Sequence, residues 1–163
     1  MHFDITYTYP ADIQRVLAML ADKEYRRIRM GNHVEFGALT SHMEGEDTVV
    51  ISEMTPAESA VPEFARKIVA KGARVFVTER VAAVGDNAGR VVMSVTAKGV
   101  PVSADVTINL EGHGNSTTAT VAGSFGINVP LVGRAIESKL SPQLNRCGVY
   151  ESRAALTYLE NHK

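Results

Sequence analysis

The polar residue best placed for chemistry in this sequence is Glu79. Valines alternate through positions 75–81, and Glu79 falls in the same register, so its carboxylate is expected on the inward side of a sheet. An inward carboxylate needs a partner or a raised pKa. Glu79 could therefore orient a ligand hydroxyl or act as a base in a cavity. The simpler interpretation is a strand-end residue that reaches water or pairs with Arg90.

Histidines near carboxylates form the second candidate group. His33 and Glu35 share one face of a predicted strand, and His42 lies on the other face. Such residues can bind a metal ion, but no third ligand follows at a spacing typical of a metal site. We therefore interpret them as ordinary strand residues and predict no metal site. If the protein is an enzyme, His42 joins Glu79 as an acid–base candidate.

Three further motifs fail on their context. Gly112 and Gly114 have the spacing that begins a dinucleotide fingerprint, but they join two predicted strands instead of a strand and a helix. Ser124 lacks the spacing of a nucleophile elbow. Cys147 is the single cysteine, which excludes an internal disulfide and a cysteine-based zinc site, and it lies on an apolar helical stripe. The sequence thus predicts no catalytic residue and no cofactor.

The composition is that of an ordinary globular protein. The chain has 163 residues, of which 45% are hydrophobic, and this suits a single domain, 1–163, with a sizeable core. A net charge of −1 gives no long-range attraction to nucleic acid or to an acidic membrane surface. No apolar run approaches the roughly 18 residues needed to span a bilayer. Residues 1–9 lack the basic start and apolar block of a signal peptide, so we expect a cytoplasmic protein.

Alternating apolar residues predict seven strands, and short turns between them predict antiparallel neighbours. The expected strands cover 2–9, 33–43, 48–54, 74–84, 90–98, 102–111 and 117–127. Two short helices should follow the first strand, one opened by Pro10 and one capped by Asp22. Four basic residues are interpreted as the solvated face of the second helix, with a phosphate site as the alternative: Lys23, Arg26, Arg27 and Arg29.

The last third of the chain, 129–160, is expected to organise the fold. Pro130 suits the first position of a helix, and apolar residues then recur every four positions: Val132, Ile136, Leu140 and Leu144. Pro142 leaves two interpretations open, either two packed helices or one bent helix whose bend leaves room for a guest molecule. Pro62 begins a short amphipathic helix between the third and fourth strands, which is either a lid over a pocket mouth or a crossover packed on the sheet edge.

Two motifs connect this pattern to a known superfamily. The segment 125–133, FGINVPLVG, and the segment 61–64, VPEF, are similar to a small, uncharacterised bacterial branch of the START-like superfamily (SRPBCC, birch-pollen-allergen-like). The order of elements also resembles this superfamily along nearly the whole chain. The resemblance implies an α+β helix-grip fold: a curved seven-stranded antiparallel sheet wrapped around a long C-terminal helix, with a hydrophobic cavity between them. Pro142 departs from the unbroken last helix that is usual in the family.

The resulting functional hypothesis is a binding or carrier protein for a small hydrophobic or amphipathic ligand, such as a lipid, fatty acid or polyketide. The expected lining of its cavity is Phe36, Phe64, Val77, Glu79, Met93, Ile136, Leu140 and Leu144. A carrier needs no activated nucleophile, and none is seen. The alternatives are a cyclase or dehydratase that uses Glu79 or His42, and a ligand-free interaction module whose interior is filled by methionines.

Overall fold

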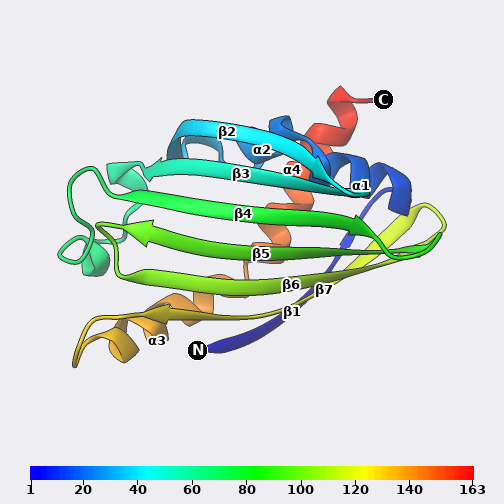
Figure 1. Ribbon diagram of the computed structural model, residues 1–163. Helices are drawn as coiled ribbons and strands as arrows, with labels where there is room; N and C mark the ends of the chain where they lie inside the picture. Colours follow the sequence, from blue (N-terminus) through cyan, green and yellow to red (C-terminus); the bar gives the residue numbers. More distant parts are fainter.

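A computed structural model describes residues 1–163 and shows one curved antiparallel sheet of seven strands, in the order β1-β7-β6-β5-β4-β3-β2 (Figure 1). The strands are β1 (His2–Tyr9), β2 (Val34–Glu44), β3 (Asp47–Pro56), β4 (Arg74–Ala83), β5 (Ala88–Lys98), β6 (Val102–His113) and β7 (Ser116–Ile127). Six of the strands follow one another as neighbours, whereas β1 pairs with β7. The two edges of the sheet are therefore β1 and β2.

Two short helices after β1 cover one end of the sheet. They are α1 (Ile13–Ala21) and α2 (Lys23–Met30), and both lie behind the sheet in Figure 1. Asp12 caps α1 by accepting a hydrogen bond from the backbone N–H of Arg15, and Asp22 caps α2 by accepting one from Glu24. A single 3-10 turn, η1 (Gly31–His33), leads from α2 into β2.

The C-terminal part of the chain forms two consecutive helices, α3 (Gly133–Leu144) and α4 (Cys147–Asn161). Asn145 and Arg146 separate them, and both keep right-handed helical backbone angles, so the chain bends there without leaving the helical path. Pro142 lies inside α3, near its end. α3 packs against β7, and α4 packs against β1, α1 and α2. Both helices thus make their main sheet contacts at the β1 edge.

The segment between β3 and β4 has less helix than its sequence predicts. It contains two single 3-10 turns, η2 (Glu58–Ala60) and η3 (Glu63–Ala65), in place of one amphipathic α-helix. The seven strands and two N-terminal helices lie within a few residues of their predicted bounds. The expected α+β helix-grip fold is confirmed. No helix of the chain is both long enough and apolar enough to cross a lipid bilayer.

The main core lies between α1, α2, α4 and the end of the sheet that they cover. Its members come from both ends of the chain and from the central strands, and the largest of them are Tyr9, Met19, Leu20, Tyr25 and Tyr158. Gly148 allows α4 to approach β1 closely, because a Cβ atom at this position would lie 3.1 Å from the Cβ of Tyr7. Burial of these apolar side chains fixes α4 against the first strand.

Candidate functional site

The inner face of the sheet is completely covered at one end only. One row of side chains across β4–β7, defined by the strand register, is fully buried: Val81, Val91, Ile108 and Val121. In the row four residues away along the strands, only Val77 is buried. The other three side chains are half-buried: Val95, Ala104 and Phe125. The second row lies toward the β3–β4 connection, so apolar surface at this end of the inner face remains accessible. We call this region the open half of the inner face.

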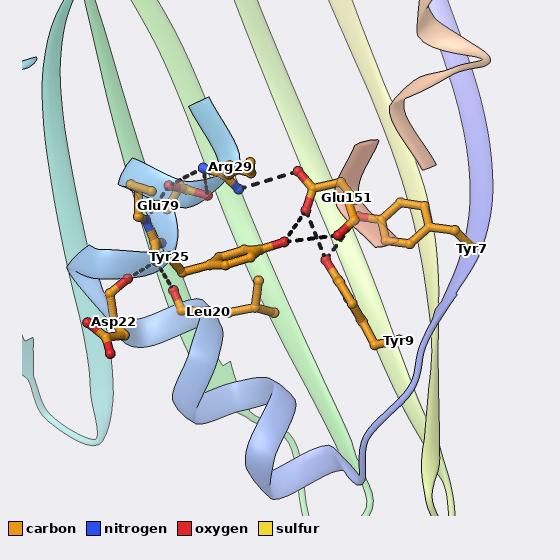
Figure 2. A network of polar contacts seen from close by, with 9 residues as sticks. Tyr7, Tyr9, Leu20, Asp22, Tyr25, Arg29, Glu79 and Glu151 are labelled. Carbon is orange, nitrogen blue, oxygen red and sulfur yellow. Dashed lines mark hydrogen bonds and ion pairs between the residues drawn. The ribbon is translucent and has the colours of Figure 1, made fainter. Parts of the chain in front are cut away.

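Glu79 lies between the packed end and the open half, and its side chain is 1% exposed. Its carboxylate oxygen Oε2 accepts a hydrogen bond from Arg26 Nε at 2.9 Å and one from Arg29 Nη2 at 3.0 Å (Figure 2). Burial alone would raise the pKa of Glu79. The charges of Arg29 and Arg26, together with their hydrogen bonds, outweigh burial and lower the pKa below its ordinary value. Glu79 is therefore a buried carboxylate that is charged at neutral pH.

Arg29 connects Glu79 to a second carboxylate, Glu151 of α4. Arg29 Nη1 lies 3.7 Å from Glu151 Oε1, and the hydroxyls of Tyr25 and Tyr9 donate hydrogen bonds to Glu151 Oε2 at 2.6 and 3.3 Å (Figure 2). The Tyr7 hydroxyl follows at 3.3 Å from that of Tyr9. Burial first, and then the charge of Glu151, raises the pKa of all three tyrosines. Their hydroxyls stay protonated and serve as hydrogen-bond donors.

Arg26 is held from three sides. Its Nη1 donates hydrogen bonds to the backbone oxygens of Leu20 and Asp22, the second at 3.0 Å, while its Nε contacts Glu79. Its Nη2 is buried without a partner in the protein. The two arginines balance the two glutamates in charge, which lowers the cost of burying all four groups. The network therefore joins α2, β4 and α4, and offers no carboxylate that is free to act as a base.

The prediction for Glu79 was correct in orientation and wrong in partner. Arg90 lies on the other face and donates a hydrogen bond from Nε to Asn109 Oδ1 at 3.3 Å. The interpretation of the basic residues of α2 as a solvated face was also wrong for two of them. Arg26 is fully buried and Arg29 nearly so, whereas only Lys23 and Arg27 face solvent.

The other predicted lining residues are distributed along the inner face and α3. Val77 and Ile136 are buried, and five are half-buried: Phe36, Phe64, Met93, Leu140 and Leu144. Met93 is the direct cross-strand neighbour of Glu79. The ring of Phe64 lies 5.3 Å from Lys139 Nζ, so the β3–β4 connection touches α3. Phe64 and Lys139 therefore bound the open half at its outer end.

The histidine candidates lie away from this region. His42 is on the β2–β3 hairpin, half of its side chain is exposed, and its Nε2 lies 3.0 Å from Glu44 Oε1. His33 is exposed at the end of η1, just before β2. The structure brings no three His, Cys, Asp or Glu side chains into a group that could hold a metal ion.

Two pockets open at the outer end of the sheet. One of about 440 Å³ lies along the β3–β4 connection, with Thr55, Val61, Arg66 and Lys71 in its lining. The other, of about 380 Å³, lies where β7 meets α3, with Ile127, Arg134 and Glu137 in its lining. Neither pocket is lined by the predicted cavity residues. Both flank the open half.

Sequence reasoning missed most of the polar network: Tyr7, Tyr9, Tyr25, Arg26, Arg29 and Glu151. Periodicity arguments count arginine and glutamate as solvated, so the burial of Arg26 and Arg29 on α2 was not recognised. One signal was present, since Tyr25 and Arg29 are four residues apart and therefore share a helix face. Glu151 carries no comparable signal, because its partners come from distant parts of the chain.

The family described as "Protein of unknown function (DUF2505)" matches residues 4–159. No curated protein matches the sequence. Among solved structures, a START superfamily protein from Mycobacterium smegmatis is 9% identical with a TM-score of 0.61, covering 96% of this chain and 98% of that one.

Two further solved structures share the fold. The protein TTHA0849 from Thermus thermophilus is 17% identical with a TM-score of 0.60, covering 97% of this chain and 99% of its own. The Zhui aromatase/cyclase from Streptomyces sp. R1128 is 14% identical with a TM-score of 0.58, covering 98% of this chain and 93% of its own. At these identities the likeness concerns the fold alone. The chain belongs to the family described as "Protein of unknown function (DUF2505)", and it has the helix-grip fold of the START-like superfamily.

Proposed function

We propose that the protein binds a small hydrophobic or amphipathic molecule, such as a lipid, a fatty acid or a polyketide-like compound, on the open half of its inner face. The observation that carries this proposal is the change in burial along the sheet. Val81 and Val91 are sealed beneath the helices, whereas Met93, Val95 and Phe125 on the same face are half-buried. Accessible apolar surface on a concave sheet is the usual lining of a small-molecule site.

The polar end of such a ligand would meet the edge of the ion network. Among its charged members, Arg29 and Glu151 have partly exposed side chains, at 13% and 18%. They could orient a hydroxyl, carbonyl or carboxyl group of the ligand, while its apolar part lies along Met93 and Phe125. Affinity would come mainly from apolar burial, at roughly 25 cal/mol per Å². This arrangement favours an amphipathic ligand over a purely apolar one.

Binding without chemistry fits the network better than the cyclase alternative. Glu79 has a lowered pKa and is engaged by two arginines, which makes it a poor general base. His42 lies outside the open half. An interior filled by methionines also fits less well, because Met93 is only half-buried and Met43 is exposed. Because the Zhui aromatase/cyclase has a similar fold, the enzyme alternative is tested together with the binding proposal.

The test combines two measurements on the purified protein. Native mass spectrometry of protein from its own host should show a co-purifying apolar small molecule. The apolar dye anilinonaphthalene sulfonate should gain fluorescence with the protein, and a fatty acid should displace it. Protein that carries no small molecule and gives no displaceable dye signal would refute the proposal. Turnover of a polyketide-like probe, lost in a Glu79→Gln or a His42→Gln variant, would favour the enzyme alternative.

A further inference from the structure

The loop between β7 and α3 exposes an aliphatic side chain that no other part of the protein covers. Leu131 has a relative exposure of 103% and a positive φ of 71°, and its neighbour Val132 is also exposed. Residues other than glycine, asparagine and aspartate rarely adopt this left-handed backbone conformation, because the Cβ atom crowds the following carbonyl. A strained backbone that presents leucine to solvent points to a role outside the folded core.

Three chain connections meet at this end of the molecule. The backbone N–H of Asn128 donates a hydrogen bond to the carbonyl oxygen of Pro101 at 2.8 Å, and that of Ala70 donates one to Gly99 at 2.7 Å. The β3–β4 connection, the β5–β6 turn and the β7–α3 loop therefore form one continuous end of the protein. In Figure 1 the β7–α3 loop projects beyond the end of the sheet, at the lower left. We call this region the loop end.

The loop end is basic although the whole chain has a net charge of −1. The loop end, taken as residues 57–73, 98–101 and 128–139, contains six basic residues and three acidic ones. The six are all exposed: Arg66, Lys67, Lys71, Lys98, Arg134 and Lys139. One of the three carboxylates, Glu137, lies 3.8 Å from the N-terminal amine and is compensated there. The combination of an exposed apolar tip and surrounding cations is typical of surfaces that bind anionic lipid bilayers.

We infer that the loop end docks on an anionic membrane surface, with Leu131 and Val132 inserted among the lipid head groups and the lysines and arginines above the phosphates. A projecting leucine favours a bilayer over an acidic protein, because a protein partner would need a matching pocket to bury the side chain. The open half of the inner face lies at the same end, so a docked protein could exchange its ligand with the bilayer. This role in exchange rests on the proposed function, whereas the docking surface does not.

The test measures co-sedimentation of the full-length protein with lipid vesicles. The protein should bind phosphatidylcholine vesicles that contain phosphatidylglycerol, bind pure phosphatidylcholine vesicles much less, and dissociate as salt is raised. Leu131→Asn removes the apolar tip and suits the left-handed backbone, so the fold is retained while vesicle binding falls about tenfold. Lys67→Glu should lower binding about fivefold.

The matched control is Met43→Asn. Met43 is 61% exposed on the β2–β3 hairpin, at the opposite end of the sheet, and its replacement should leave vesicle binding unchanged. Absence of binding to phosphatidylglycerol vesicles, or equal losses in Leu131→Asn and Met43→Asn, would overturn the inference. Binding to polyglutamate in solution without binding to vesicles would assign the surface to an acidic protein instead.

The same variants separate this inference from the ligand proposal. Leu131→Asn should take up the dye as the wild type does while it loses vesicle binding. Vesicle binding by a wild-type protein that takes up no dye would contradict the ligand proposal and leave the docking surface in place. Dye uptake without vesicle binding would contradict the docking surface alone.

Discussion

Arg26 and Glu79 form an ion pair of 2.9 Å in which each side chain is only 1% exposed. The pair joins the second helix to the middle of the sheet, and Arg29 extends it to the last helix through Glu151. Charges at this depth depend on one another, because removal of either partner leaves the other uncompensated in a medium of low polarity.

The first prediction concerns the loss of one partner. Glu79→Gln should lower the free energy of unfolding by about 3–5 kcal/mol, since both arginines lose their buried counter-charge. Urea denaturation followed by circular dichroism measures this. Glu46→Gln, on the exposed β2–β3 turn, is the control and should change stability by less than about 0.5 kcal/mol. Equal effects of the two substitutions would show that the pair contributes nothing particular.

The second prediction concerns acid. The pKa of Glu79 in the folded protein lies below the ordinary value of 4.5 that applies in the unfolded chain. As the pH falls, the unfolded chain takes up the proton before the folded protein does. The stabilisation that Glu79 provides above pH 4.5 is therefore lost as the pH falls toward the pKa of Glu79 in the folded protein. Unfolding free energies measured against pH should fall more steeply for the wild type than for Glu79→Gln in this range. Parallel curves would contradict the lowered pKa.

The third prediction concerns the tyrosine donors of Glu151. Tyr25→Phe removes a hydrogen bond of 2.6 Å to a carboxylate and should cost about 1–3 kcal/mol of stability. Tyr9→Phe removes two longer contacts of 3.3 Å, one to Glu151 and one to the Tyr7 hydroxyl, and should cost less. Thermal denaturation of the two variants tests the order. A larger loss for Tyr9→Phe would mean that the short contact is not the stronger one.

The fourth prediction concerns the ligand site. Met93→Trp adds bulk to the open half and should weaken dye binding about tenfold while stability changes little, because the side chain enters accessible space. Val92→Trp is the matched control on the adjacent residue, whose side chain is 46% exposed on the outer face. Fluorescence titration compares the two. Equal dye affinities would place the dye site elsewhere on the molecule.

The fifth prediction concerns the loop tip. Leu131→Asn should raise the free energy of unfolding by about 0.5–1 kcal/mol, because asparagine tolerates the left-handed backbone better than leucine does. Differential scanning calorimetry would show a higher Tm. The variant is thus expected to gain stability while it loses vesicle binding, a combination that general damage to the fold cannot produce.

Much of the fold could be predicted from local pattern. Strand alternation, the capping residue Asp22 and the short turns depend only on neighbouring residues, and these features lie where the sequence places them. The inward direction of Glu79 follows from strand parity for the same reason. The bend between α3 and α4 at Asn145 and Arg146 could not be decided from the sequence, because a proline in a helix permits either a bend or a separation.

The polar network could not be predicted, because it depends on contacts between distant segments. Arg26 meets Glu79 and Tyr25 meets Glu151 only after the sheet has formed and α4 has folded across it. A sequence pattern treats each of these residues as solvated, and burial is decided by partners that the pattern does not contain. The partial cover of Val95 and Phe125 is also a tertiary property, since it depends on the path of α3 along β7.

The pairing of β1 with β7 has a consequence for biosynthesis. The first strand of the fold has the seventh strand as its only sheet partner, and Glu151, which completes the ion network, is made later still. A nascent chain therefore exposes an unpaired β1 edge and uncompensated arginines until both β7 and α4 have been made. We expect the emergence of α4, and not that of any single strand, to be the moment at which this fold forms.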